Sequence, residues 1–262
     1  MLRMLNKKVA VITAVLIIVG LAGSYYLSNK SEPIGYGAPP YLDELDEAIP
    51  EYPFTDRYPD FSKWQRPEGP YKVGLQVGHW KSDELPDELE RLGTSSGTRN
   101  GSIAEWEVNL RIAEETKTLL EKEGVVVDIL PATVPKSYWA DAFVAIHADG
   151  SEDYRTSGFK VAAPGRDLTH RSDELVQILE EEYEKVTNLP KDPNISRNMT
   201  GYYAFSWRRH EHAIHPMTTA VILETGFLTN PHEAKMLIND PSTPAKAIAQ
   251  ALVRYLNAHV VL

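Results

Sequence analysis

The chain contains the segment Ala140-Asp141-Ala142-Phe143-Val144-Ala145-Ile146-His147-Ala148-Asp149, in which an apolar run is followed directly by a histidine. The run Ala142–Ile146 has the length and composition of a β-strand. A histidine placed where such a strand ends is also a candidate functional residue. The segment therefore bears on both the fold and the site.

Similar strand-length runs recur on both sides of this segment, and amphipathic stretches lie between them. The predicted strands are Lys72–Val77, Val125–Leu130, Ala142–Ile146, Phe159–Ala163 and Ala220–Leu223. The predicted helices are Ala104–Glu123, which is followed by a glycine stop, Asp173–Val186 and Pro244–His259. Strands that alternate with helices predict an α/β domain with a largely parallel sheet.

Composition excludes several classes of protein. The chain has 262 residues, a net charge of −10 and no cysteine. The acidic balance argues against a nucleic-acid partner. The absence of cysteine excludes disulfide scaffolds, thiolate metal sites and thiol nucleophiles. Any metal must therefore be bound by His, Asp or Glu side chains.

The N-terminus carries a candidate membrane segment. Basic residues within 1–8 precede the uncharged run 9–27, which is close to the ~20 residues that span a bilayer as a helix. The basic end predicts that residues 1–8 stay in the cytoplasm and the rest lies outside. A cleaved signal peptide is the alternative, because Ala22-Gly23-Ser24 offers small residues to a peptidase. Both interpretations export the protein, either anchored to the cytoplasmic membrane or secreted.

Residues 28–70 are predicted to form an acidic, proline-rich linker to a domain at 71–262. The linker holds eight of the 18 prolines, which interrupt helices and central strands. It also contains several aromatic residues. We expect part of it to wrap the surface of the following domain, and an aromatic sugar-binding platform is the alternative.

Four ionisable residues stand at predicted strand ends or at a helix start: His79, Glu105, His147 and Glu224. Ligands bind beyond the carboxyl ends of strands in sheets of this kind. Two imidazoles and one carboxylate suit Zn²⁺ with a fourth position for water, and a further carboxylate could carry the proton. Each residue alone also has a structural interpretation, such as a hydrogen-bonded histidine or an acid favoured by the helix dipole.

The local motifs around these residues resemble one family. The motifs are Val77-Gly78-His79, Glu105-Trp106-Glu107-Val108-Asn109-Leu110, the segment at 140–149, and Leu223-Glu224-Thr225-Gly226-Phe227-Leu228-Thr229-Asn230. In this order they resemble the zinc-dependent N-acetylmuramoyl-L-alanine amidases of the cell-wall amidase type 3 family, over about residues 71–259.

The resemblance implies a fold, a reaction and a set of site residues. The fold would be a mixed α/β domain around a six-stranded sheet, preceded here by a single N-terminal transmembrane helix. The substrate would be peptidoglycan, cleaved at the amide between N-acetylmuramic acid and L-alanine. By position, His79, Glu105 and His147 would bind Zn²⁺. Glu224 would deprotonate the attacking water and then protonate the departing nitrogen.

The chain departs from the family pattern near the first ligand. Gln76-Val77 stands where Asp-Pro is common, and Trp80 follows where glycine is common. The indole could pack, narrow the cleft or stack on a sugar ring. The spacing to the second ligand is longer than usual, which predicts a rim loop or small lid in the region 83–94. Asp149 replaces the usual asparagine.

A second polar cluster lies at 208–215. Arg208, Arg209 and three histidines favour a solvated or substrate-rim cluster over a second metal site, although His212 and His215 could share a helix face. The arginines could pair with stem-peptide carboxylates. Tyr202 falls in a stretch, 201–205, that takes the place of a family strand bordering the cleft. Trp80, Tyr202, Arg208 and Arg209 are thus the candidate substrate-binding residues.

Three functions remain open from the sequence. The first is an active, membrane-tethered peptidoglycan amidase, with division or activator proteins as candidate partners. The second is a catalytically silent relative that binds wall material or a partner. The third is a zinc amidohydrolase that acts on another exported amide or peptide.

Overall fold

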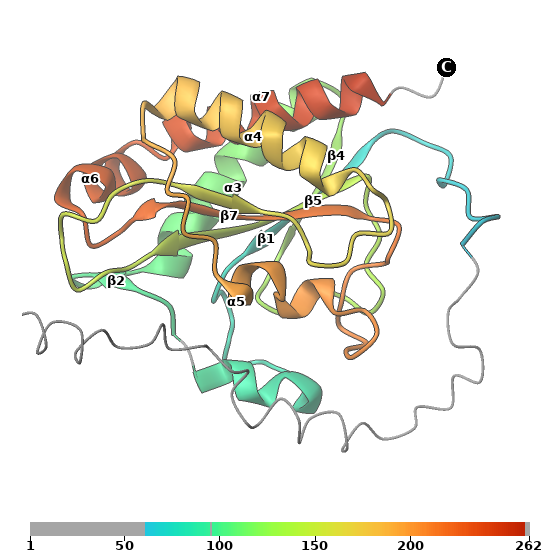
Figure 1. Ribbon diagram of the computed structural model, residues 1–262, viewed down its shortest axis with the longest axis horizontal. Helices are drawn as coiled ribbons and strands as arrows, with labels where there is room; N and C mark the ends of the chain where they lie inside the picture. Colours follow the sequence, from blue (N-terminus) through green and yellow to red (C-terminus); the bar gives the residue numbers. More distant parts are fainter. Residues whose placement is uncertain (1–60, 95, 260–262) are drawn as a thin grey trace, which may run out of the picture. The chain divides into compact units, whose positions relative to one another are not determined.

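A computed structural model describes residues 61–94 and 96–259. Within this part the main sheet has five strands in the order β4-β1-β5-β7-β6 (Figure 1). Their bounds are β1 Lys72–Val77, β4 Val126–Leu130, β5 Ala142–Asp149, β6 Lys160–Ala162 and β7 Thr219–Phe227. The pairs β1–β4, β1–β5 and β5–β7 are parallel, and β6 runs antiparallel to β7.

The prediction of a mixed, largely parallel sheet is confirmed, but the prediction of six strands is wrong for the described residues. The remaining strands, β2 Arg99–Asn100 and β3 Ile103–Ala104, form a separate antiparallel pair. They connect the loop after β1 to the first long helix. Because they pair with each other, they add no strand to the main sheet.

Helices cover both faces of the sheet. The long helices are α3 Glu105–Lys122, α4 Ser172–Thr187 and α7 Ser242–Ala258, with α6 Pro231–Asn239 beside them. Helix α7 packs against both α3 and α4 on one face. The short elements η1 Asp87–Thr94, α5 Arg197–Thr200 and η2 Tyr203–Phe205 belong to the other side. In the view of Figure 1, α4 and α7 lie above the sheet and α5 below it.

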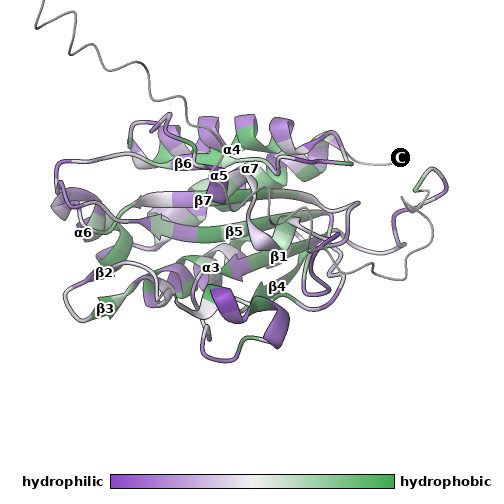
Figure 2. Ribbon diagram, turned by 60° about the horizontal axis from the view of Figure 1, so that its bottom comes forward, coloured by the Kyte–Doolittle hydropathy of each residue, from purple (hydrophilic) through white to green (hydrophobic). Residues whose placement is uncertain are grey.

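The strands alternate their side chains between two cores. On β1, Val73, Leu75 and Val77 pack into the large core beneath the long helices, so Gln76 faces the opposite side. That side holds a smaller core, in which Phe143 and Ala145 of β5 meet Tyr203. Figure 2 shows β5 mostly in the hydrophobic colour, while α4 carries hydrophilic bands. A central strand buried on both faces has this composition.

The stretch 201–205, which takes the place of a family strand, forms no strand in the structure. Residues 203–205 form the 3-10 helix η2, with Phe205 N donating to Tyr202 O (2.9 Å) and Ser206 N to Tyr203 O (2.9 Å). Tyr203, Ala204 and Phe205 are all buried. Three consecutive buried side chains suit a tight turn in a core better than the alternation of a strand with one solvated face.

Helix α6 was absent from the sequence prediction. Asn230 begins it, because its side chain accepts hydrogen bonds from the backbone N–H groups of His232 and Glu233. Pro231 follows at the first helical position, where a missing N–H costs nothing. An Asn-Pro pair after a strand is the signal that could have found it.

No helix in residues 61–94 and 96–259 is long and apolar enough to cross a membrane. The predicted membrane segment 9–27 and most of the predicted linker lie outside the described residues. The end of that linker contacts the domain: the guanidinium of Arg66 makes two hydrogen bonds to the carboxylate of Asp141, at 2.5 and 2.9 Å.

Candidate active site

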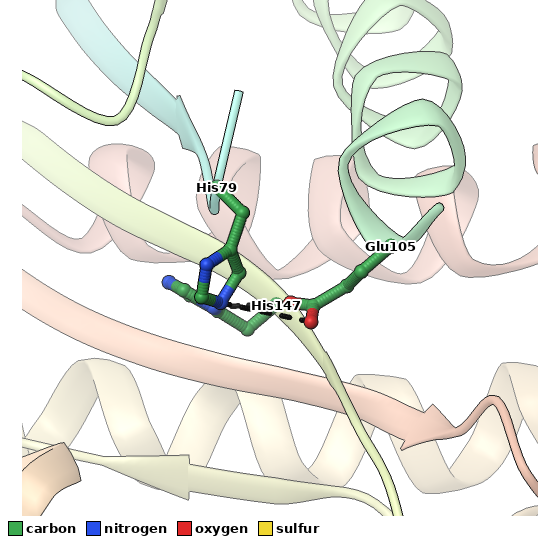
Figure 3. Close-up of side chains that lie close together, drawn as sticks. All are labelled: His79, Glu105 and His147. Atoms are coloured by element: carbon green, nitrogen blue, oxygen red, sulfur yellow. Dashed lines mark hydrogen bonds and ion pairs between the residues drawn. The ribbon is translucent and has the colours of Figure 1, made fainter. Parts of the chain in front are cut away.

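Three side chains from separate elements meet at the carboxyl edge of the parallel strands. His79 follows β1, His147 lies near the end of β5 and Glu105 is the first residue of α3. One potential ligand atom from each lies within 4.8 Å of the others. Figure 3 shows the three side chains converging on one point. The prediction from strand ends and motifs thus selected residues that the fold brings together.

Glu105 is the centre of this cluster. One carboxylate oxygen, Oε1, lies 3.1 Å from Nδ1 of His147, and the other, Oε2, lies 3.6 Å from Nε2 of His79. The backbone N–H of Ala148 and that of Thr98 also donate to the carboxylate. Burial alone raises the pKa of Glu105, but the hydrogen bond and charge of His147 outweigh it and hold that pKa below its usual range. The group is therefore an anion at neutral pH.

The cluster fits a zinc ion. Ligand atoms bound tetrahedrally at about 2.0–2.1 Å from one Zn²⁺ lie about 3.3 Å apart. The separations of 3.1 Å to one oxygen of Glu105 and 3.6 Å to the other are close to that spacing, and one ligand atom from each of the three residues lies within 4.8 Å of the others. A carboxylate that is only 3% exposed is costly unless it is paired or bound to a metal. Two imidazoles and one anion complete the donor set that the sequence predicted.

The backbone before His79 is shaped around His147. A Cβ on Gly78 would lie 2.4 Å from the His147 ring, so no larger residue fits there without movement. His79 itself adopts a left-handed conformation with φ of 63°. That conformation is uncommon for a residue other than glycine and is often found at functional sites.

Glu224 stands beside the cluster on the neighbouring strand. It pairs in register with His147 across β5 and β7, on the same face of the sheet. Burial raises the pKa of Glu224 to about 7, against the opposing charge of His147. Among the described residues, no hydrogen bond or ion pair engages its carboxylate. A carboxyl group with this pKa beside a metal cluster can both accept and release a proton near neutral pH.

Lys160 is a charged neighbour that the sequence analysis missed. It faces Glu224 across β6 and β7, and its ammonium contacts the carboxylates of Asp149 and Asp192. Lys160 is buried, and its charge favours the ionised form of Glu224. The antiparallel return of β6 places this lysine, and no local pattern in the sequence signalled that pairing.

Two candidate substrate-binding residues have defined surroundings. Trp80 is half-buried and packs against the large core, and its carbonyl accepts from the N–H of Ala132 (2.8 Å). The Tyr202 hydroxyl lies 3.3 Å from Nε2 of His147. A direct role of either ring in substrate binding stays a prediction.

The arginine and histidine cluster lies in a loop, where His212 and His215 share no helix. It is held by Glu88 from η1, whose carboxylate accepts from the N–H groups of Glu211 (3.0 Å) and His212 (2.8 Å) and lies 2.6 Å from Nδ1 of His212. Arg208 lies over the Trp207 ring. In the described part of the chain, His79, Glu105 and His147 form the one group suited to a metal. Contacts of Arg208 and Arg209 with substrate stay a prediction.

The described residues thus form an α/β domain with a candidate His–Glu–His metal site at the carboxyl edge of its parallel strands. Residues 73–254 match the family described as N-acetylmuramoyl-L-alanine amidase. The chain therefore belongs to the N-acetylmuramoyl-L-alanine amidase family, and the predicted enzyme class is confirmed. No curated protein matches the chain.

Solved structures share the fold. An N-acetylmuramoyl-L-alanine amidase from Clostridium difficile 630 is 20% identical, with a TM-score of 0.53, over 74% of this chain and 100% of that one. The amidase Ami1 from Mycobacterium smegmatis is 18% identical, with a TM-score of 0.54, over 72% and 98% of the two chains. The CwlD amidase from Clostridioides difficile, in complex with the GerS lipoprotein, is 21% identical, with a TM-score of 0.50, over 72% and 99%.

Proposed function

We propose that this protein hydrolyses the amide between N-acetylmuramic acid and L-alanine in peptidoglycan, in a zinc-dependent reaction. The observation that carries the proposal is the register of β5 and β7. It sets the carboxylate of Glu224 opposite His147, beside a cluster of two histidines and a glutamate that fits zinc. The family match supports the substrate class.

The four site residues would have two roles, zinc binding and proton transfer. His79, Glu105 and His147 would hold the zinc, which supplies Lewis-acid activation of water and carbonyl when bound. Glu224 accepts a proton from the attacking water as its oxygen bonds to the carbonyl carbon. It then gives that proton to the alanine nitrogen as the C–N bond breaks. Water is consumed, and a lactyl carboxylate and a free amine are released.

The location and partners of the enzyme are part of the same proposal. Residues 9–27 would anchor the chain to the cytoplasmic membrane, or export it as a cleaved signal, with the catalytic domain outside. Peptidoglycan lies in that compartment. The lipoprotein complex of the similar Clostridioides difficile amidase supports a search for an activator or division partner.

A comparison of three proteins tests this function. Zinc-loaded wild type, Glu224→Gln and the exposed control Glu152→Gln are incubated with purified sacculi, and released peptides are identified by mass spectrometry. Wild type and control should release stem peptides with a free L-alanine amine. Glu224→Gln should retain zinc, and its rate of peptide release should fall by about 10²- to 10⁴-fold, the usual contribution of a general base.

Two results would overturn the proposal. A wild type that binds zinc but releases no peptide would indicate a silent binding relative or a different amide substrate. Glu224→Gln with wild-type activity would remove Glu224 from the reaction.

A further inference from the structure

A chain of hydrogen bonds connects His147 to the backbone on the far side of β1. Nε2 of His147 lies 3.3 Å from the Tyr202 hydroxyl, which lies 2.9 Å from Oε1 of Gln76. Nε2 of Gln76 then donates to the Ala132 carbonyl and to the Tyr203 hydroxyl, both at 2.8 Å. The chain joins segments far apart in sequence behind the metal cluster.

Two backbone groups set the direction of every bond in this chain. The N–H of Val134 donates to the Tyr203 hydroxyl, and the carbonyl of Ala132 accepts the proton of that hydroxyl. A carbonyl can only accept. The Gln76 atom that faces Ala132 must therefore be the amide nitrogen, so its oxygen faces Tyr202.

The same reasoning fixes the protonation pattern of His147. Because Oε1 of Gln76 can only accept a hydrogen bond, the Tyr202 hydroxyl donates its single proton to Gln76. At His147 the hydroxyl can then only accept, so Nε2 carries a proton. Nδ1 is then the nitrogen that faces the metal cluster, where it donates to the Glu105 carboxylate 3.1 Å away and would give up that proton when zinc binds.

We propose that Tyr202 and Gln76 are positioning residues that hold His147 with Nε2 protonated and Nδ1 directed toward zinc. The inference rests on the metal-dependent part of the proposed function. A hydrogen bond to the remote nitrogen of a ligating histidine fixes its tautomer and ring orientation. Here a buried glutamine acts through a tyrosine to do this.

Packing around the two residues supports this role. Gln76 is fully buried between the sheet and the small core, where an amide without partners would be costly. The Tyr202 ring packs edge-on against the His147 ring, with centroids 5.5 Å apart. The tyrosine thus restrains the imidazole by ring contact and by hydrogen bond together.

Two variants and a control test the inference. Tyr202→Phe removes the acceptor for Nε2–H and keeps the ring. Gln76→Met leaves the tyrosine in place but frees its hydroxyl to donate to Nε2, which favours the wrong tautomer. Tyr255→Phe is the control, because it removes a buried hydroxyl bonded to Thr219, away from the site.

Two measurements test the inference and do not depend on amidase activity. The first is the zinc dissociation constant by chelator competition, with folding checked by circular dichroism. We expect about 10- to 100-fold weaker zinc binding in Tyr202→Phe and Gln76→Met, as for other partners of ligating histidines, and an unchanged value in Tyr255→Phe. The second is the ¹H–¹⁵N spectrum of the His147 ring in zinc-loaded protein. Wild type should show a slowly exchanging Nε2–H, and Tyr202→Phe a fast one.

The outcomes separate this inference from the proposed function. A wild type that binds no zinc overturns the metal-dependent function and the inference with it. A zinc-binding wild type whose two variants match it in affinity overturns the inference alone. A proton on Nδ1 of His147 in the zinc-loaded wild type also overturns it. Should Gln76→Met fail to fold, Tyr202→Phe decides the test.

Discussion

Gly78 and His147 approach each other so closely that a Cβ on Gly78 would lie 2.4 Å from Cε1 and Nδ1 of the imidazole. The parallel pairing of β1 with β5 causes this approach, since Val77 is in register with Ile146 and Gly78, the residue after β1, comes to lie beside His147, the next residue of β5. The glycine before the first predicted ligand therefore makes room for the second.

Gly78→Ala should displace the His147 ring. Overpacking of this kind costs about 1–3 kcal/mol of stability. A shifted ligand should also weaken zinc binding by at least about tenfold, as measured by chelator competition. Gly165→Ala is the matched control, because its Cβ would be 3.5 Å from the Thr200 carbonyl, an ordinary contact. Equal zinc affinity in the two variants would contradict this reading of Gly78.

Removal of zinc should lower thermal stability through the three clustered side chains. A ligand present at about 100 times its Kd stabilises the native state by about 2.7 kcal/mol. Differential scanning calorimetry with and without chelator should therefore show a higher Tm for the loaded protein. His147→Ala should lose that difference, whereas the exposed control His232→Ala should keep it. A zinc-dependent Tm that persists in His147→Ala would place the ion elsewhere.

The 3-10 helix η1 in the extra loop after β1 should behave as a fixed rim and not as a loose lid. Leu89 is only 1% exposed and packs in the small core, whereas Leu92 on the same helix is 42% exposed. Leu89→Ala should cost about 2–5 kcal/mol in urea unfolding. Leu92→Ala should change the free energy of unfolding by less than about 0.5 kcal/mol. Similar small effects at both positions would favour a lid.

Asp167 should contribute stability that depends on pH. Its carboxylate accepts from the N–H groups of Thr169, Arg171 and Ser172 at the start of α4. Burial raises the pKa of Asp167, but the hydrogen bonds from Thr169 and Ser172 outweigh it and lower that pKa below its usual value. Because the folded pKa is the lower one, the stabilisation is present above the unfolded pKa of about 3.9 and disappears as pH falls through the folded value.

Asp167→Asn should therefore be less stable than wild type at pH 7, by about 0.5–2 kcal/mol, as for a lost capping side chain. Urea unfolding at a series of pH values should show this difference shrinking as the pH falls below about 4. Glu152→Gln, an exposed carboxylate, should show no such trend. A difference that stays constant with pH would assign the role of Asp167 to packing.

Periodicity was sufficient for the regular elements. The strand Lys72–Val77 has the same bounds in the sequence prediction and in the structure, and the helix predicted at Ala104–Glu123 is α3, one residue shorter at each end. These patterns are local, because burial of one strand or helix face repeats every few residues. The candidate metal ligands could also be predicted, since His79 and His147 follow strand runs and their neighbours form motifs that resemble one family.

Local sequence patterns could not predict the roles of residues whose partners are distant in the sequence. Gln76 was noted only as a departure from a motif, and Lys160 and Glu88 were not noted at all. The contacts of Gln76 with Tyr202, of Glu88 with His212 and of Lys160 with Asp192 join separate elements. Such contacts follow from strand register and loop path, which no short sequence window contains.

The amino-acid pattern thus determined the α/β class and the order of the main strands and helices along the chain, and its motifs pointed to the candidate metal-site residues. Tertiary structure alone decided the number of strands in the main sheet, the helical turn at Tyr203–Phe205 and the hydrogen-bond chain behind His147. The physical reason is the sequence separation of the interacting residues. The periodic burial of a helix or strand face is visible within one element. Strand pairing and hydrogen-bond direction depend on which elements the whole fold brings together.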